Sequence, residues 1–242
     1  MFPWARDKKW PFIEIQKSAI IPGMKRALIL CGGWDGHEPE AVTEIFDLIL
    51  KEKGFETQIE RDPECFAKLG DELEKFDLLV PCWTMGQISG ESEAAVCRAV
   101  QNGMGIAGCH GGMCDAFRSA SEWQFMTGGQ FVAHPGNDGT VYEVHVDDLD
   151  HEITSGITRF SVSTEQYYMH IDPAVHVLAS CRFPVADGPH VPNGDVSMPL
   201  MWTKFYGKGK VFYCSLGHNA AAVSMEPMPT FMRRGFNWAA RS

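Results

Sequence analysis

A cysteine and a histidine stand side by side where a short apolar run of the sequence meets a pair of glycines. The stretch is GIAGCHGGM, residues 105–113, and its two reactive side chains are Cys109 and His110. Several α/β enzymes use a sharp turn from a strand into a helix to lift one side chain into a pocket. A thiol at such a turn is a potential nucleophile, whereas an imidazole transfers protons near neutral pH or binds a divalent metal ion. The register of this turn therefore decides which chemistry the chain can perform.

Three histidines directly follow predicted strands, together with aromatic and polar residues. In an open parallel sheet, ligands bind beyond the carboxyl ends of the strands, where the connecting loops gather around a crevice. A single histidine after a strand is more often a loop residue bonded to a backbone carbonyl, but the glycine-rich turns here favour a pocket. We therefore expect one shared pocket, with contributions from Trp34, Asp35, His37, Trp83, Gln87, His110, His218 and Asn219.

The elements that must position these residues alternate between strand and helix patterns in the first half of the chain. Short apolar or alternating runs predict strands at residues 26–31, 55–60, 76–81 and 104–109. Apolar residues at helical spacing predict one helix between Pro39 and Gly54 and another over Glu91–Gln101. Strands that alternate with helices indicate a parallel sheet with helices on both faces.

The second half of the chain is richer in strands and loops. Candidate strands lie at residues 140–146, 175–181, 199–203 and 210–216, and a final helix is predicted over Thr230–Ala240. Phe183–Ser197 contains three prolines and two glycines and is predicted to be a long surface loop. Residues 1–23 are interpreted as an N-terminal arm and residues 24–242 as one α/β domain. An arm that packs on the domain is the favoured interpretation, and a strap between subunits or a lid over the pocket are the alternatives. The arm also makes a homo-oligomer the expected state.

Composition and charge narrow the classes of partner. The chain has 242 residues, 45% of them hydrophobic, with a formal net charge of -10 and a pI ≈ 5.3. It lacks the basic stripe that displaces counterions from nucleic-acid phosphates, so we expect no nucleic-acid and no membrane partner. GGWDGH lacks the Lys-Ser/Thr pair of a phosphate-binding loop, so no nucleotide cofactor is expected either. A small molecule is the favoured ligand.

The cysteines and the hydropathy of the sequence indicate the cellular compartment. The eight cysteines sit singly among apolar residues, which is typical of reduced thiols in a core. No stretch approaches the roughly 20 apolar residues of a membrane span, and the first 23 residues lack a signal-peptide core. These features predict a cytoplasmic protein.

Five segments of the sequence resemble the successive signatures of one family. They are RALILCGGWDGHEPE, GMGIAGCHGGMCDAF, GGQFVAHPG, HEITSGITRFSVSTEQYYMHIDP and WTKFYGKGKVFYCSLGH. In order and spacing they are similar to the ThuA-like family, which is associated with trehalose utilisation. The resemblance implies a flavodoxin-like three-layer α/β sandwich related to class I glutamine amidotransferases, with a mostly parallel central sheet and a β-rich elaboration in the second half. It also implies a role in the catabolism of disaccharides and oxidised sugars.

The resemblance also bears on the register of the turn. Related amidotransferases carry a nucleophilic cysteine in a G-x-C-x-G turn, and this pattern laid over GCHGG puts His110 at the nucleophile's position. Cys109 then falls one residue early and points into the sheet, because side chains alternate along a strand. A cysteine-dependent amidotransferase is therefore disfavoured, although a shift of the turn by one residue restores Cys109 as nucleophile. Cys114 falls within the following helix.

Candidate roles follow for the family-like segments. His110, Glu165 and His218 are the predicted catalytic residues. Three histidines and a carboxylate suit zinc or a related divalent ion, although no two histidines share a local metal-binding spacing. The predicted metal ligands are His37, His110, His134 and His218. The predicted sugar-binding residues are Trp34, Asp35, His37, Trp83, His134, Tyr167 and Asn219.

Two functions from different classes follow, together with a third alternative. The first is an enzyme, a lyase, isomerase or hydrolase, that acts on a disaccharide or a keto sugar by histidine acid–base chemistry, with or without a metal ion. The second is a non-catalytic carbohydrate-binding or regulatory protein on a degenerate amidotransferase-like fold. The third is a thiol-dependent amidase that uses Cys109. The remaining histidines are interpreted as structural or surface residues, namely His145, His151, His170, His176 and His190.

Overall fold

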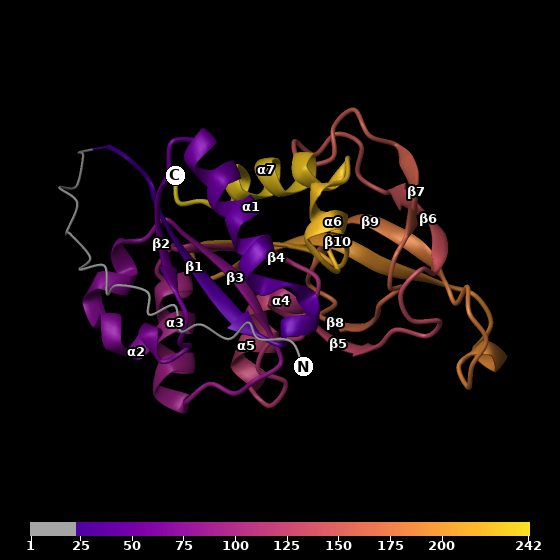
Figure 1. Cartoon of the computed structure of the whole chain (residues 1–242), viewed down its shortest axis with the longest axis horizontal. Helices are drawn as coiled ribbons and strands as arrows, with labels where there is room; N and C mark the ends of the chain where they lie inside the picture. The colour runs from indigo at the N-terminus through magenta and orange to yellow at the C-terminus, as the bar shows by residue number, and fades with distance from the viewer. Residues whose placement is uncertain (1–22) are drawn as a thin grey trace, which may run out of the picture.

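A nine-stranded mixed sheet forms the centre of the computed structural model, which describes residues 23–242 (Figure 1). Five of its strands run parallel in the order β2-β1-β3-β4-β11, which is the 2-1-3-4-5 order of flavodoxin-like folds. Their bounds are β1 (Arg26–Gly33), β2 (Glu56–Glu60), β3 (Leu78–Thr84), β4 (Gly105–Cys109) and β11 (Gly209–Cys214). The flavodoxin-like parallel sheet predicted from the sequence is therefore confirmed.

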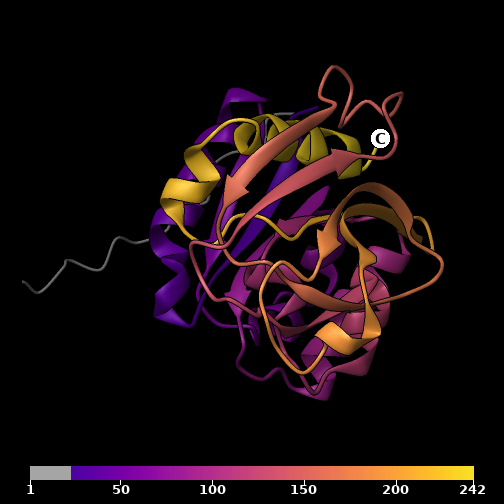
Figure 2. The same ribbon diagram turned by 90° about the vertical axis from the view of Figure 1, so that its right-hand side faces the viewer.

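Antiparallel strands of the second half extend this sheet in the order β10-β9-β6-β7. Their bounds are β6 (Val141–Val146), β7 (Arg159–Ser163), β9 (His176–Phe183) and β10 (Val196–Tyr206). A separate two-stranded sheet pairs β5 (Gly129–Ala133) with β8 (Tyr168–Ile171). Figure 2 shows β6 and β7 running beside the C-terminal helices. The predicted β-rich elaboration is confirmed, but β5, β7 and β8, of four or five residues each, were not predicted.

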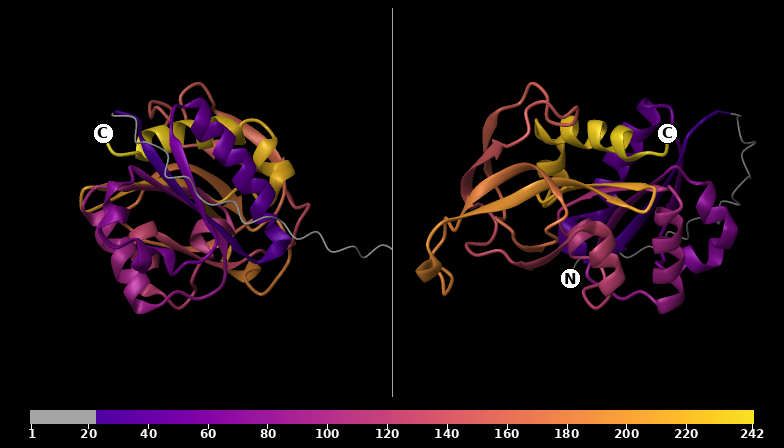
Figure 3. Two further views of the ribbon diagram at one scale, coloured as in Figure 1. Left: turned by 60° about the vertical axis from the view of Figure 1, so that its left-hand side comes forward. Right: turned by 180° about the vertical axis from the view of Figure 1, so that it is seen from behind.

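Helices cover both faces of the parallel strands and complete a three-layer sandwich (Figure 3). One face carries α1 (Pro39–Glu52), α6 (Ala220–Ser224) and α7 (Met228–Ala239). The other carries α2 (Cys65–Leu69), α3 (Gly90–Gln101) and α5 (Ser121–Thr127). A single turn, α4 (Gly111–Cys114), follows β4 directly, and the short 3-10 helices are η1 (Asp35–His37), η2 (Gly70–Lys75) and η3 (Val191–Asn193).

The apolar faces of helices α1 and α7 pack against each other. Phe46 on α1 and Phe236 on α7 are fully buried, and their rings meet edge to face at 5.2 Å between centroids. Edge-to-face aromatic pairs of this kind add to the stabilisation from burial alone. Pro39 occupies the start of α1, where its missing N–H has no helical partner to lose. The helices predicted at both ends of the chain are therefore confirmed within two residues.

The predicted long loop is shorter than expected, because strand pairing continues into it. Val196 pairs with Phe183, so β9 and β10 form a long hairpin, and residues 184–195 with η3 make its tip. This tip extends away from the body of the molecule (Figure 3). The prediction of a loop over Phe183–Ser197 is therefore confirmed within two residues at each end.

The predicted N-terminal arm lies, up to residue 22, outside the described residues. Its roles as packing arm, subunit strap or lid, the expected homo-oligomer and the division of the chain into arm and domain all stay predictions. Within residues 23–242, no helix combines the length and apolar character needed to cross a membrane.

Candidate active site

The turn between β4 and α4 holds a histidine in a conformation that few side chains adopt. His110 has φ 49° and ψ -142°, and it is one residue past the strand and one before the helix. A positive φ is uncommon for residues other than glycine and is a source of strain that tends to occur at functional sites. A Cβ at position 112 would lie 3.2 Å from the Cys82 Cα and the Pro81 oxygen, so a side chain there would crowd the backbone of β3. The turn therefore presents an imidazole in the way that α/β hydrolases present their nucleophile.

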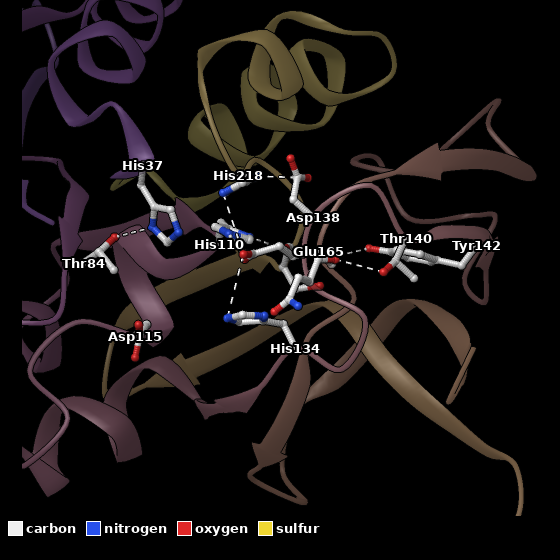
Figure 4. Close-up of polar contacts among 12 residues, drawn as sticks. His37, Thr84, His110, Asp115, His134, Asp138, Thr140, Tyr142, Glu165 and His218 are labelled. Atoms are coloured by element: carbon white, nitrogen blue, oxygen red, sulfur yellow. Dashed lines mark hydrogen bonds and ion pairs between the residues drawn. The ribbon is translucent and has the colours of Figure 1, made fainter. Parts of the chain in front are cut away.

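The Glu165 carboxylate lies at the centre of a cluster of imidazoles (Figure 4). Its Oε2 lies 3.2 Å from His110 Nε2, while its Oε1 lies 3.8 Å from both His134 Nε2 and His218 Nε2. The rings of His37 and His110 meet edge to face at 4.7 Å. His110 and Glu165 are only 2% and 7% exposed, so this centre is largely shielded from water. Residues far apart in the chain thus converge on one carboxylate.

Polar groups outside the cluster contact Nδ1 of most of these imidazoles and so orient the rings. His110 Nδ1 lies 2.8 Å from the Ser215 carbonyl oxygen, and His37 Nδ1 lies 2.9 Å from the Thr84 hydroxyl. His218 Nδ1 lies 3.2 Å from an oxygen of Asp138. The bonds to Ser215 and Thr84 orient the rings of His110 and His37, and the Ser215 carbonyl also fixes the tautomer of His110. His134 Nδ1 and His218 Nδ1 are both buried, and neither has a hydrogen-bond partner among the described residues.

Burial controls the protonation of the central pair. Burial lowers the pKa of His110, although its contacts with Glu165 and Ser215 oppose that shift. Burial alone raises the pKa of Glu165, but the contact with His110 and the surrounding imidazoles outweigh it and leave that pKa below its usual value. His37 has its pKa lowered to about 3, first by burial and then by His110. His37 and His110 are therefore favoured as neutral imidazoles at neutral pH, beside an ionised Glu165.

In these forms His110 Nε2 and Glu165 Oε2 are both hydrogen-bond acceptors, and they face each other. Because the Ser215 carbonyl only accepts, His110 Nδ1 must carry the proton, and the neutral ring then directs the lone pair of Nε2 toward ionised Glu165. Either an extra proton or a cation must lie between these atoms to satisfy both. Donor atoms of His37, His110 and Glu165 all lie within 4.8 Å of one another. Two ligands of a tetrahedral zinc ion are about 3.3 Å apart, given bonds near 2.0–2.1 Å. The 3.2 Å between His110 and Glu165 matches this spacing, whereas a donor up to 4.8 Å away has to move closer to bind the same ion.

Aromatic rings form one wall of the site. Tyr167 is buried and stacks on His110 with 4.1 Å between ring centroids, and Phe131 packs against Tyr167 at 4.4 Å. Trp34 lies on the loop after β1, remains 47% exposed and meets His37 edge to face at 4.8 Å. An exposed indole beside a polar cluster offers a face on which a sugar ring can stack.

Three residues predicted to bind sugar have other contacts in the structure. Trp83 packs against the backbone of Gly32 and Gly86 and stacks on Phe117, away from the histidine cluster. Asn219 caps α6 by accepting a hydrogen bond from Ala222 N. Asp35 is exposed in η1, where its carbonyl accepts from Glu38 N. Their predicted role in binding sugar stays a prediction.

Cys109, the last residue of β4, lines the same small cavity as His37 and His110. It is buried, and a Cβ added to Gly217 would lie 2.8 Å from its sulfur. Burial raises the pKa of the Cys109 thiol well above its usual value, and Cys114 in α4 behaves in the same way. A thiolate nucleophile is disfavoured at both positions.

Backbone strain gathers around the site. Within residues 23–242, positive φ angles occur at a few residues other than glycine, and all of them lie in turns and loops between strands and helices. They are Glu38, Met85, His110, Phe117 and Asn137. Met85 directly follows β3, as His110 follows β4, and Glu38 lies between η1 and α1. Strain of this kind is maintained only where the surrounding structure imposes it, and it accompanies functional sites.

Sequence reasoning missed several groups that complete the site. Thr84 lies within the post-strand segment CWTMGQ, so its position carried a signal. Phe131 lies on β5, a strand that was not predicted, and Asp138 lies in a turn-rich loop where a surface role was the default. The Ser215 carbonyl is a main-chain group and has no sequence signal.

The histidines interpreted as structural or surface residues lie apart from the cluster. His176 Nε2 lies 2.7 Å from Asp148, and His151 Nδ1 accepts a hydrogen bond from Ile153 N. His145 is exposed and lies 3.0 Å from Glu143, and His190 contacts the carbonyl of Ala186. His170 is exposed on β8.

Comparisons with known proteins agree with this architecture. A family model described as ThuA, trehalose utilisation, matches residues 26–239. A ThuA-like protein from Bacteroides uniformis ATCC 8492 superposes with a TM-score of 0.71 at 19% identity, over 93% of this chain and 95% of that chain. A ThuA-like protein from Parabacteroides merdae ATCC 43184 gives 0.68 at 18% identity over 89% of each chain. A cytoplasmic protein from Salmonella typhimurium LT2 gives 0.63 at 12%, over 89% of this chain and all 100% of that one. No curated protein matches the chain.

Proposed function

The chain belongs to the ThuA family, and on this premise we propose that it is an enzyme of carbohydrate metabolism acting on a disaccharide or a keto sugar. The proposed chemistry is acid–base catalysis by Glu165, His110 and His218 around a divalent cation. The proposed site of action is the cytoplasm, in line with the description of the similar Salmonella protein. The rest of the proposal comes from the geometry of the site.

One observation carries this proposal, namely the short contact between two acceptors at its centre. His110 Nε2 and Glu165 Oε2 are 3.2 Å apart in a buried setting, and both atoms have lone pairs in their favoured forms. Three further imidazoles beside such a pair can stabilise charge that changes during a reaction. This arrangement is typical of an acid–base centre rather than of a structural salt bridge.

The residues best placed to hold a cation are His37, His110 and Glu165. Neutral imidazoles and one carboxylate are ligands that zinc and related ions prefer, and the outer contacts with Thr84 and Ser215 are typical of ligating histidines. When bound, such an ion acts as a Lewis acid that polarises a carbonyl of the substrate.

Glu165 is the proposed base. Its Oε1 lies 3.8 Å from Nε2 of both His134 and His218, while its Oε2 makes the contact with His110. That oxygen can take a proton from the carbon next to a ketone, and His218 can return a proton to the product. Proton abstraction of this kind starts both isomerisation and β-elimination of a keto sugar. The same pair can activate water for hydrolysis, so lyase, isomerase and hydrolase reactions share these residues.

The aromatic wall supports a carbohydrate rather than an apolar substrate. Trp34 is half exposed next to His37, and the buried face of Tyr167 backs the catalytic ring of His110. Stacking of a sugar on such rings orients it while its hydroxyl groups meet the polar cluster.

A panel of disaccharides and their keto derivatives, assayed for both binding and turnover, tests this function. The wild type is expected to convert at least one keto sugar, and His110→Ala is expected to bind it but to lose turnover. Asp187→Ala is the control, because Asp187 is exposed in the hairpin tip. Binding without turnover in both the wild type and His110→Ala favours a non-catalytic sugar-binding protein, and neither binding nor turnover with any sugar contradicts the proposal.

A further inference from the structure

Three sulfur atoms gather under the turn that carries His110, on the side of the sheet that α7 covers. Cys109 and Cys214 are paired residues at the ends of β4 and β11, parallel strands about 4.8 Å apart, so their side chains lie on the same face. Cys214 Sγ lies 3.9 Å from Met228 Sδ. All three residues are buried, and both thiols are free. Two thiols and a thioether thus form a compact group of soft donors.

Gly217 leaves the space beside these sulfurs open. A Cβ there would lie 2.8 Å from Cys109 Sγ and 3.2 Å from Met228 Cε, so a side chain would push into the group. Its φ of 108° is a conformation that glycine adopts readily. Gly217 also lines the small cavity beside Cys109 and a pocket of ≈ 70 Å³ that Met228 and the exposed Met225 share. A small ion therefore has a route from the surface toward the sulfurs.

Burial keeps the two thiols uncharged in the absence of a cation. It raises the pKa of Cys214 to about 12 and the pKa of Cys109 well above its usual value. A monovalent cation that binds both sulfurs as thiolates displaces two protons and leaves one negative charge on the group. Helix α7 begins at Met228, so the positive end of its dipole lies beside this charge and stabilises it.

The type, number and spacing of the donors suit a soft monovalent ion. Thiolate and thioether sulfur select Cu(I), and structural zinc takes four ligands where this group offers three. Three sulfurs in a plane around one ion, with bonds of about 2.3 Å, are about 4.0 Å apart. The 3.9 Å between Cys214 and Met228 matches this spacing. The group therefore favours an ion of a different class from the divalent ion that imidazoles and a carboxylate prefer.

We propose that Cys109, Cys214 and Met228 bind one Cu(I) ion under the turn of His110. Each thiol releases its proton to solvent as its sulfur bonds the ion, and the thioether of Met228 donates a lone pair without losing a proton. The ion stays Cu(I), so no electron is transferred. This site does not depend on the proposed sugar chemistry, because its ligands are other residues.

An anaerobic titration with Cu(I) buffered by bicinchoninate tests the site on the reduced full chain, after incubation with zinc to occupy the imidazole cluster. The wild type is expected to take about one equivalent of Cu(I) from the chelator. Cys109→Ala and Cys214→Ala are expected to lose this ion. Met228→Leu keeps the volume of the side chain and is expected to bind the ion about tenfold more weakly. Cys97→Ala is the control and retains the ion, because Cys97 is a buried thiol on α3, on the other face of the sheet.

X-ray absorption at the copper edge of the wild type gives a readout that needs no variant. The expected spectrum shows sulfur neighbours at about 2.3 Å and no nitrogen or oxygen neighbours. His37→Asn is expected to retain the ion with the same spectrum, which separates this site from the imidazole cluster. A wild type that takes no Cu(I) from the chelator, a copper ion surrounded by nitrogen or oxygen, or full binding in Cys109→Ala and Cys214→Ala overturns the proposal.

Discussion

The two halves of the molecule contribute to the site in different ways. The parallel half supplies His37 and His110 from regular turns after β1 and β4, where their outer nitrogens meet Thr84 and the Ser215 carbonyl. The antiparallel half supplies His134, Asp138 and Glu165 from segments outside the regular strands. One half therefore provides a rigid frame for neutral imidazoles, and the other provides the carboxylates.

The two halves also differ in how their residues are held. In the parallel half, β4 and its turn are constrained by close backbone packing, such as the 3.2 Å contacts that a Cβ at position 112 would make. In the antiparallel half, Glu165 is held by the Tyr142 hydroxyl, which donates to its main-chain oxygen, and its side chain is free to serve the site. Frame residues that lie outside the site are therefore expected to affect stability, and residues that line the site, from either half, are expected to affect turnover.

Removal of the central charge is expected to have the largest effect. Glu165→Gln keeps the size of the side chain but removes the base, and kcat/KM on a converted keto sugar is expected to fall by about 10³-fold. Glu143→Gln on β6 is the matched control, because Glu143 is exposed and contacts only His145. A Glu165→Gln enzyme within tenfold of the wild type would show that the carboxylate is not the base.

A substitution in the frame is expected to act on stability instead. Phe236→Ala removes a fully buried ring that packs on Phe46, and the free energy of unfolding is expected to fall by about 3 kcal/mol. Urea denaturation measures this change, and the folded variant is expected to keep its kcat at low temperature. A large loss of kcat in the folded variant would mean that the frame takes part in turnover.

The sugar platform is expected to have a smaller effect, confined to binding. Trp34→Ala removes a half-exposed indole beside His37, so KM is expected to rise about tenfold while kcat changes little. Phe205→Ala is the control, since Phe205 is exposed on β10. An unchanged KM would place the sugar elsewhere.

The smallest expected effect is on the pH dependence of stability. Because the pKa of His37 falls from 6.5 to about 3 on folding, the unfolded chain binds more protons between these values, and stability falls as the pH drops. His37→Gln in chelated protein is expected to flatten the dependence between pH 6.5 and 4.5, a window above the usual pKa of carboxylates. Urea titrations across this window, with His145→Gln as the exposed control, measure the slope. Equal slopes for wild type and His37→Gln would contradict the buried neutral ring.

The sequence predicts the site residues of the parallel half better than those of the antiparallel half, and the reason is physical. His37, His110 and His218 each follow a buried strand, so the topology of a parallel sheet is enough to bring them to one edge. Glu165 and His134 follow no such rule, and family resemblance rather than pattern pointed to them. Asp138 and the Ser215 carbonyl depend on contacts between distant loops, which local periodicity does not encode.

Metal analysis of the protein purified without chelator tests the central claim most directly. We expect about one equivalent of a divalent transition metal per chain in the wild type, and a loss of it in Glu165→Gln and His37→Asn, whereas Glu143→Gln retains it. Less than a tenth of an equivalent in the wild type, even after incubation with zinc or manganese, would contradict the assignment of the His110–Glu165 contact to a cation site.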